Sequence, residues 1–212
     1  MQPSPMRYLL FISCFCFLQA CSSLYSNLQK TETDKNCLQK FKPSFTSVLY
    51  SAKADVIGKH LSGLLIIKKM PDSSIRIVFS SEMGFTFFDF EFRNDGSFEV
   101  HNITKQMDKK SVIRTLKKDF ELILMENLKN KLSYSFKDSA FVYTAFPQTK
   151  GVYYYITDLN CTQLIKMQRA SKSKIAVEAV MQNYINGIPD TIGFSHNIKI
   201  SNFDIGLKRI ER

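Results

Sequence analysis

Two carboxylates in one short segment are the first side chains in this sequence whose types suit acid–base chemistry. Asp89 and Glu91 lie two residues apart in T-F-F-D-F-E-F at 86–92, where phenylalanine and charge alternate. Paired carboxylates can transfer protons, but alternation places them on the strand face opposite the phenylalanines. We therefore expect both acids to meet solvent, or Arg93 and a lysine of the neighbouring strand.

The three histidines lack the spacing of a metal or catalytic site. His60 begins a predicted strand, His101 shares a strand face with Glu99, and His196 is expected in a turn. None has a second ligand at metal spacing, and the glycines are scattered singly rather than in a phosphate-binding loop. We predict no catalytic residue, no metal, no cofactor and no enzyme activity. An envelope hydrolase remains an alternative, and it requires histidine and carboxylate groups that converge only in space.

The first twenty residues have the form of an export signal. Residues 8–18 are apolar but too short to span a bilayer as a helix of about 20 residues, so 1–20 is predicted to be a signal peptide. The run ends in L-Q-A-C at 18–21, which resembles the lipobox of bacterial lipoproteins. We expect acylation of Cys21 and a polar tether over 21–43; a cleaved, secreted protein is the alternative.

The rest of the chain, 44–212, is predicted to be a single domain, since it shows no repeat and no internal linker. The net formal charge of +10 favours contact with anionic lipid, although basicity that serves only solubility fits equally well. Because the protein is expected to be exported, we expect no nucleic-acid partner. Export also permits a disulfide between Cys37 and Cys161, and both the bonded and the free state stay open.

Period-two patterns and turn signals predict a mainly β (α+β) chain of short antiparallel strands. Before residue 101 the predicted strands are 46–57, 60–69, 75–81 and a hairpin within 86–100. Later ones are predicted at 131–136, 140–146, 152–159, 161–168, 174–183, 191–196, 198–201 and 203–210.

One segment, 108–128, has helical spacing instead. It carries an apolar stripe that includes Leu116 and Phe120, and its opposite face is rich in lysine and arginine. Asp108 is the predicted N-cap. A basic amphipathic helix can lie on an anionic membrane, but the width of the stripe favours packing against a sheet.

One helix cannot cover a sheet of about a dozen strands, because open sheets beyond about 10 strands curl, split or flatten. We predict a large curled antiparallel sheet, an incomplete barrel, with the helix at about 108–128 packed in its concave face; a two-layer sandwich is the alternative. Such a curled sheet leaves an apolar groove. The residues expected to line it are Phe88, Phe90, Phe92, Phe120, Phe141 and Tyr143.

Several features are shared with a known group: the lipobox at Cys21, the segments G-L-L-I-I-K-K and I-R-I-V-F-S-S-E-M-G-F-T-F-F-D-F-E-F, the helix that interrupts the strands, and the ending I-P-D-T-I-G-F-S-H-N-I-K-I-S-N-F-D-I-G-L-K-R-I. Together they make the sequence resemble the LolA/LolB group of bacterial lipoprotein carriers and receptors. The resemblance implies an unclosed barrel with a helical lid over a cavity for acyl chains. It also implies an apolar residue that protrudes from an early turn, a position that Met83 occupies here; a methionine folded back onto its neighbours is the alternative.

Two functions follow as expectations. The first is a lipid-anchored protein of the cell envelope, in the outer membrane, that holds an acyl chain or lipoprotein in an apolar groove. The second is a structural or accessory envelope lipoprotein with a filled core and no ligand. An open space between the helix and the sheet would favour the first function, and a filled space would favour the second.

Overall fold

The computed structural model describes residues 24–56, 58–129, 132–197 and 204–210. The strands before the helix are β1 (Gln29–Thr31), β2 (Ser47–Val56), β3 (Lys59–Lys69), β4 (Ile75–Ser80), β5 (Thr86–Phe92) and β6 (Phe98–Ile103). Those after it are β7 (Tyr134–Lys137), β8 (Phe141–Pro147), β9 (Val152–Asp158), β10 (Leu164–Ala170), β11 (Ile175–Ile185), β12 (Ile188–His196) and β13 (Asp204–Arg209). The strand predicted at 198–201 lies outside the described residues.

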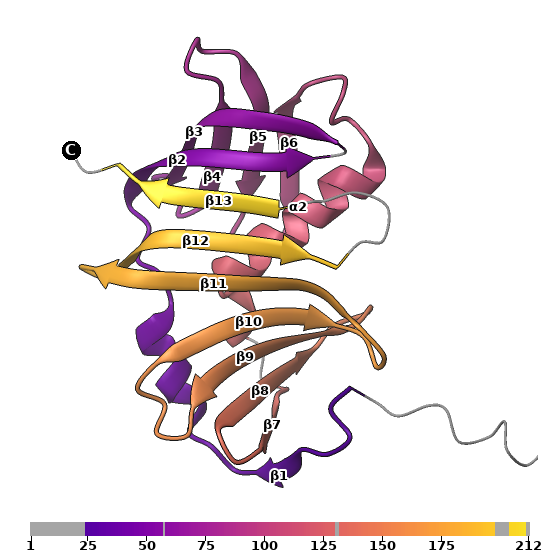
Figure 1. Ribbon diagram of the computed structural model, residues 1–212. Coiled ribbons are helices and arrows are strands. Elements are labelled where there is room, and N and C mark those ends of the chain that lie inside the picture. Colours follow the sequence, from indigo (N-terminus) through magenta and orange to yellow (C-terminus); the bar gives the residue numbers. More distant parts are fainter. Residues whose placement is uncertain (1–23, 57, 130–131, 198–203, 211–212) are drawn as a thin grey trace, which may run out of the picture.

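All the described strands belong to one antiparallel sheet (Figure 1). Its 13 strands follow the order β1-β7-β8-β9-β10-β11-β12-β13-β2-β3-β4-β5-β6, so β1 and β6 are edges and the sheet is not closed into a barrel. The sheet is therefore two meanders joined side by side. The pairing of β13 with β2, from Asp204 opposite Asp55 to Arg209 opposite Tyr50, makes the joint.

The helix α2 (Lys110–Ile123) links the two meanders. It follows the edge strand β6, crosses one face of the sheet and leads into β7 near the opposite edge (Figure 1). Its apolar side chains, including Leu116 and Phe120, are buried against that face. The prediction of a mainly β fold with a large curled sheet and one packed helix is confirmed, and the sandwich is excluded. Within the described ranges, no helix has both the length and the apolar character needed to cross a bilayer.

The helix is shorter than the predicted 108–128. Met125 takes a left-handed backbone conformation with φ 52°, which ends the regular helix, and a 3-10 turn η3 (Glu126–Lys129) follows. Lys109 is the N-cap and makes no side-chain capping bond. The predicted cap, Asp108, lies one residue earlier, and its backbone N–H donates to the carbonyl of Thr104.

Part of the predicted tether, 21–43, belongs to the folded domain. Here β1 pairs with β7, and a 3-10 helix η2 (Lys35–Phe41) follows it. Leu38 and Phe41 are buried in the main core. They lie three residues apart, and a 3-10 helix places such residues on one face. This spacing is too short to register as a helical pattern amid polar neighbours.

A disulfide joins η2 to the turn between β9 and β10. Cys37 and Cys161 are bonded across a sequence separation of 124 residues. A bridge that closes so long a loop removes much of the conformational freedom of the unfolded chain. It therefore holds the N-terminal segment against the second meander.

Replacement of both bonded cysteines by serine (Cys37→Ser with Cys161→Ser) should lower the free energy of unfolding by about 2–5 kcal/mol, because the unfolded chain regains that freedom. Urea unfolding followed by circular dichroism measures the change. A reducing agent should lower the free energy of unfolding of the original protein and leave that of the double variant unchanged. Equal stability of the two proteins would contradict a structural role for the bridge.

Candidate functional site

The phenylalanine row of β5 is packed against the helix. Phe88, Phe90 and Phe92 are all buried. The ring of Phe120 on α2 lies 5.8 Å from that of Phe88 and 6.3 Å from that of Phe92, between ring centroids. Phe194 on β12 lies 6.4 Å from Phe120 on another side. Aromatic pairs at these separations are in packing contact, so the structure brings four of the six predicted groove residues together as core.

The space between the helix and the sheet is filled. One apolar void of about 10 Å³ remains there, hereafter the core void, and it is bordered by residues that include Ala52, Ala54, Leu116 and Phe120. That volume is about the minimum for a single water molecule. Among the described residues, therefore, no groove of the predicted kind opens in front of the phenylalanine row, because the side chain of Phe120 occupies its centre.

Phe141 and Tyr143 do not join this row. They belong to a separate cluster with Tyr25 and Tyr154. In β8 the neighbouring position Phe146 contributes to the main core instead. Since successive side chains of a strand alternate between faces, the odd-numbered residues of β8 lie on the face away from α2. The prediction that Phe141 and Tyr143 line the same space is corrected by this strand parity.

The turn between β4 and β5 projects two apolar side chains into solvent. Met83 is 96% exposed and Phe85 is 61% exposed. Gly84 has φ +86°, which suits glycine, and its N–H donates to the carbonyl of Ser81 over 2.9 Å. The backbone of the turn is thus held while Met83 stands away from it, so Met83 does not fold back onto its neighbours.

A pocket of about 560 Å³ lies beside this turn, at the N-terminal end of α2. We call it the lysine-rimmed pocket. Its apolar wall is formed by Val56, Leu61, Phe85, Phe87 and Met107, and its lysines are Lys59, Lys105 and Lys109. Its volume lies in the range of about 300–1,000 Å³ that is typical of sites for small molecules. Apolar side chains with ammonium groups beside them suit a ligand that has an alkyl chain and an anionic head.

A bulge in β5 supplies part of this wall. The register with β4 shifts so that Phe88 faces Phe79 while Thr86 faces Ser80, which leaves Phe87 as the extra residue. The ring of Phe87 lies 4.8 Å from that of Phe79 and 5.7 Å from that of Phe85. Strict alternation predicts Phe87 on the outer face, so the sequence pattern misses its place in the pocket.

The carboxylates of β5 face outward, as alternation predicts, but only some of their partners are the ones expected from the sequence. Asp89 accepts two hydrogen bonds from Arg76, at 2.8 and 2.7 Å. Glu91 lies 2.6 Å from His101 and 3.6 Å from Arg93. The hydrogen bond with His101 holds the pKa of Glu91 below its usual range. The ligand atoms of Glu91, Glu99 and His101 lie within 4.8 Å of one another, but Arg93 already pairs with both glutamates.

A second charged cluster is buried under the helix. Asp119 on α2 is fully buried, with one oxygen 2.8 Å from Nε2 of His196 and the other 3.3 Å from an Nη of Arg169. The cluster ties α2 to β10 and β12. Sequence reasoning missed it and placed His196 in a turn. The available signal was that Asp119 stands three residues after Leu116, on the apolar stripe, where an acid needs a partner.

All three histidines therefore bond to acids, which meets one requirement of the hydrolase alternative. His60 pairs with Asp55 at 2.9 Å on an exposed surface, and His101 pairs with Glu91. His196 lies among core residues and does not line the lysine-rimmed pocket. The signal peptide and the predicted lipidation site, Cys21, lie outside the described residues.

Comparisons with known proteins add little to this geometry. No family model and no curated protein matches the chain. Among solved structures that are similar, a DUF1329 family protein from Desulfovibrio piger aligns over 82% of this chain and 89% of its own, with a TM-score of 0.38 and 9% sequence identity. Likeness at that level carries no functional argument, so the site is argued from its own residues.

Replacement of the buried acid by alanine (Asp119→Ala) should lower the free energy of unfolding by about 3–5 kcal/mol, because Arg169 and His196 would keep buried polar groups without their carboxylate. Urea unfolding followed by circular dichroism measures this. Asp108→Ala, at an exposed position just before the same helix, is the matched control. A loss no larger than that of the control would show that the cluster contributes nothing to stability.

Proposed function

We propose that this protein is a lipid-anchored protein of the bacterial cell envelope that docks on a membrane and holds one acyl chain in the lysine-rimmed pocket. The observation that carries the proposal is the position of Phe85, which is exposed, lines an apolar pocket and lies in the same turn as the exposed Met83. Exposed apolar patches beside polar residues mark surfaces for partners or membranes.

The exposed turn supplies the membrane contact. Insertion of Met83 and Phe85 into the acyl region of a bilayer would remove their apolar surface from water. Lys59, Lys105 and Lys109 would then lie near the anionic headgroups, and each basic residue near such a surface contributes about 1 kcal/mol. The net charge of +10 acts in the same direction.

The lysine-rimmed pocket is the proposed binding site for the acyl chain. Phe85 belongs both to the exposed turn and to the wall of the pocket, so an acyl chain can pass from the bilayer along one continuous apolar surface. Its carboxylate or phosphate end would meet the lysines at the rim. Val56 and Met107 close the inner end, and they also border the core void.

This proposal keeps the resemblance to the LolA/LolB group but moves the ligand. In this proposal the acyl chain lies at the N-terminal end of α2 rather than between α2 and the sheet, because Phe120 fills the space between them. Acylation of Cys21, attachment to the outer membrane and a lipoprotein as the source of the chain are parts of the same proposal. It assigns no catalytic residue to the protein.

The filled core favours a second candidate, a structural or accessory envelope lipoprotein without a ligand. Its support is the volume of about 10 Å³ that remains between α2 and the sheet. It predicts that the lysine-rimmed pocket stays free of lipid.

The double change Met83→Ser with Phe85→Ser should weaken binding to vesicles of phosphatidylglycerol and phosphatidylcholine by at least about tenfold, because two apolar side chains can no longer insert. Cosedimentation of a Cys21→Ser protein, which cannot be acylated, measures this without the anchor. Leu159→Ser is the matched control, because Leu159 is 50% exposed in another turn. Equal losses in both variants would refute a specific role for the β4–β5 turn.

Replacement of the inner wall residue (Met107→Ala) should join the pocket to the core void and shift its preference toward longer saturated acids than palmitate. Competition of unlabelled acids against a fluorescent fatty acid measures the preference. Leu61→Trp, which fills the pocket, should abolish binding in the same assay. If the original protein binds no fatty acid and purifies without lipid, the ligand-free accessory role is the correct one.

A further inference from the structure

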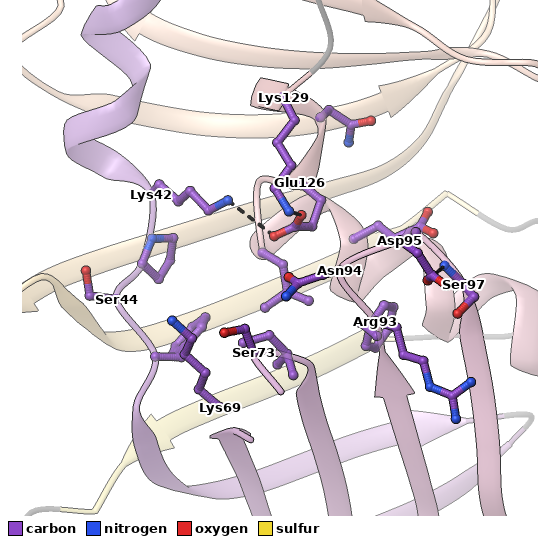
Figure 2. Close-up of a pocket in the computed structure, with 18 of the residues that line it drawn as sticks. Lys42, Ser44, Lys69, Ser73, Arg93, Asn94, Asp95, Ser97, Glu126 and Lys129 are labelled. Carbon is purple, nitrogen blue, oxygen red and sulfur yellow. Dashed lines mark hydrogen bonds and ion pairs between the residues drawn. The ribbon is translucent and has the colours of Figure 1, made fainter. Parts of the chain in front are cut away.

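A larger pocket lies at the other end of α2, and its lining has different chemistry (Figure 2). It has a volume of about 720 Å³. Five segments that are distant in sequence build its walls: the link at 42–46, the β3–β4 turn, the β5–β6 turn, the stretch from the end of α2 through η3, and the β8–β9 turn. We call it the polar pocket. It shares no lining residue with the lysine-rimmed pocket.

Three lysines line the polar pocket, and two of them share one carboxylate. Lys42 Nζ lies 3.2 Å from one oxygen of Glu126, and Lys129 pairs with the other oxygen. Figure 2 shows both lysines directed at Glu126, with Lys69 on the facing wall. Lys69 forms no ion pair within the described part of the chain. Since an ammonium has three donors, Lys42 and Lys129 keep unused N–H groups.

The charge of Glu126 is already neutralised by its neighbours. Burial acts to raise the pKa of Glu126, but the hydrogen bonds and charges of Lys129 and Lys42 outweigh it and hold that pKa below its usual range. Glu126 is therefore ionised at neutral pH and balances one lysine. Of the two lysines that pair with Glu126, one is thus not balanced, and this lysine and Lys69 give the three-lysine group an excess of positive charge.

The other charged residues of the lining are occupied elsewhere. Arg93 pairs with Glu91 and Glu99 on the outer face. Asp95 accepts the backbone N–H of Ser97 at 2.8 Å within its own turn. Glu121 lies 3.4 Å from Lys117, which is outside the pocket. Asp95 keeps its negative charge, so the lining as a whole, with four basic and three acidic side chains, has an excess of one positive charge.

Uncharged polar groups also line the pocket around Lys69. Within the described residues, the hydroxyls of Ser44 and Ser73 form no hydrogen bond, and Figure 2 shows Ser73 near Lys69, whereas the side chain of Ser44 points away from it. Asn94 and Gln148 add amide groups to the rim. Beneath them lie the buried side chains of apolar residues: Phe45, Phe92 and Leu124. The site thus combines ammonium groups, hydroxyls and amides over an apolar floor.

We propose that the polar pocket binds a phosphate ester carried on a polar group, such as a sugar phosphate or a phosphorylated headgroup. Lysine ammonium groups bind phosphate as point charges, and Lys69 with Lys42 presents two of them to one anion. The hydroxyl of Ser73 donates to a further phosphate oxygen. Asn94 and Gln148 recognise the hydroxyls of the carrier.

A neutral ligand would leave the excess positive charge without a counterion, and a long alkyl chain would cover the amides and hydroxyls without bonding them. The polar pocket is therefore a separate site from the one proposed for the acyl chain. Either site can fail its test without affecting the other.

The test uses the purified full chain with glucose 6-phosphate as the probe, and isothermal titration calorimetry as the measurement. Lys69→Ala should weaken binding about tenfold, the effect of losing one charge-assisted contact, and Lys42→Ala should also weaken it. Lys68→Ala is the matched control, since Lys68 is an exposed neighbour on β3 that does not line the pocket. Circular dichroism confirms that each variant is folded.

Two further probes identify the source of the phosphate. Glucose without phosphate should not bind. Vesicles that contain phosphatidylglycerol form the lipid arm: if only their binding depends on Lys69 and Lys42, the phosphate belongs to a headgroup. If Lys69→Ala and Lys42→Ala behave like Lys68→Ala with both phosphate probes, or if glucose binds as well as its phosphate, the proposal is overturned.

Discussion

The burial of the Phe120 ring is the constraint on which the architecture depends. The helix that carries it connects the two meanders of the sheet, so its apolar stripe has no other surface to meet than the concave face. Phe120 lies among Phe88, Phe92 and Phe194, which come from strands of both meanders. The sheet curls around this contact, and the centre of the concavity is filled. Open space remains at the two ends of the helix, where the two pockets lie.

Adjacent residues fix the helix in different ways. Phe120 packs by apolar contact, which is non-directional, whereas Asp119 bonds to Arg169 on β10 and His196 on β12 with defined geometry. A buried ion pair is a weak source of stability but can select one arrangement among several that bury the same area. We infer that Asp119 sets the rotation of α2 about its axis. It thereby keeps Lys109 at one pocket and Glu126 near the other.

Most of the fold could be predicted from local pattern, and most of the site could not. Alternation around turns located the strands, because side-chain parity is a local property of the chain. It failed at Phe87, where a bulge shifts parity, and for Phe141 and Tyr143, whose face depends on how β8 enters the sheet. The turn at Met83 could be located from sequence, but the pairing of Asp119 and the convergence of Lys42, Lys69 and Lys129 arise from contacts between distant segments.

The position of β13 sets the order in which the sheet can be completed. This strand is the last one described along the chain, yet it lies inside the sheet between β12 and β2. Until residues 204–209 have been synthesised, β2 has an unpaired edge, and unpaired edges invite aggregation. The nascent chain therefore carries two incomplete sheets with exposed apolar faces. A chain that stops short of β13 keeps the edges of β2 and β12 open, so the last described strand completes the sheet.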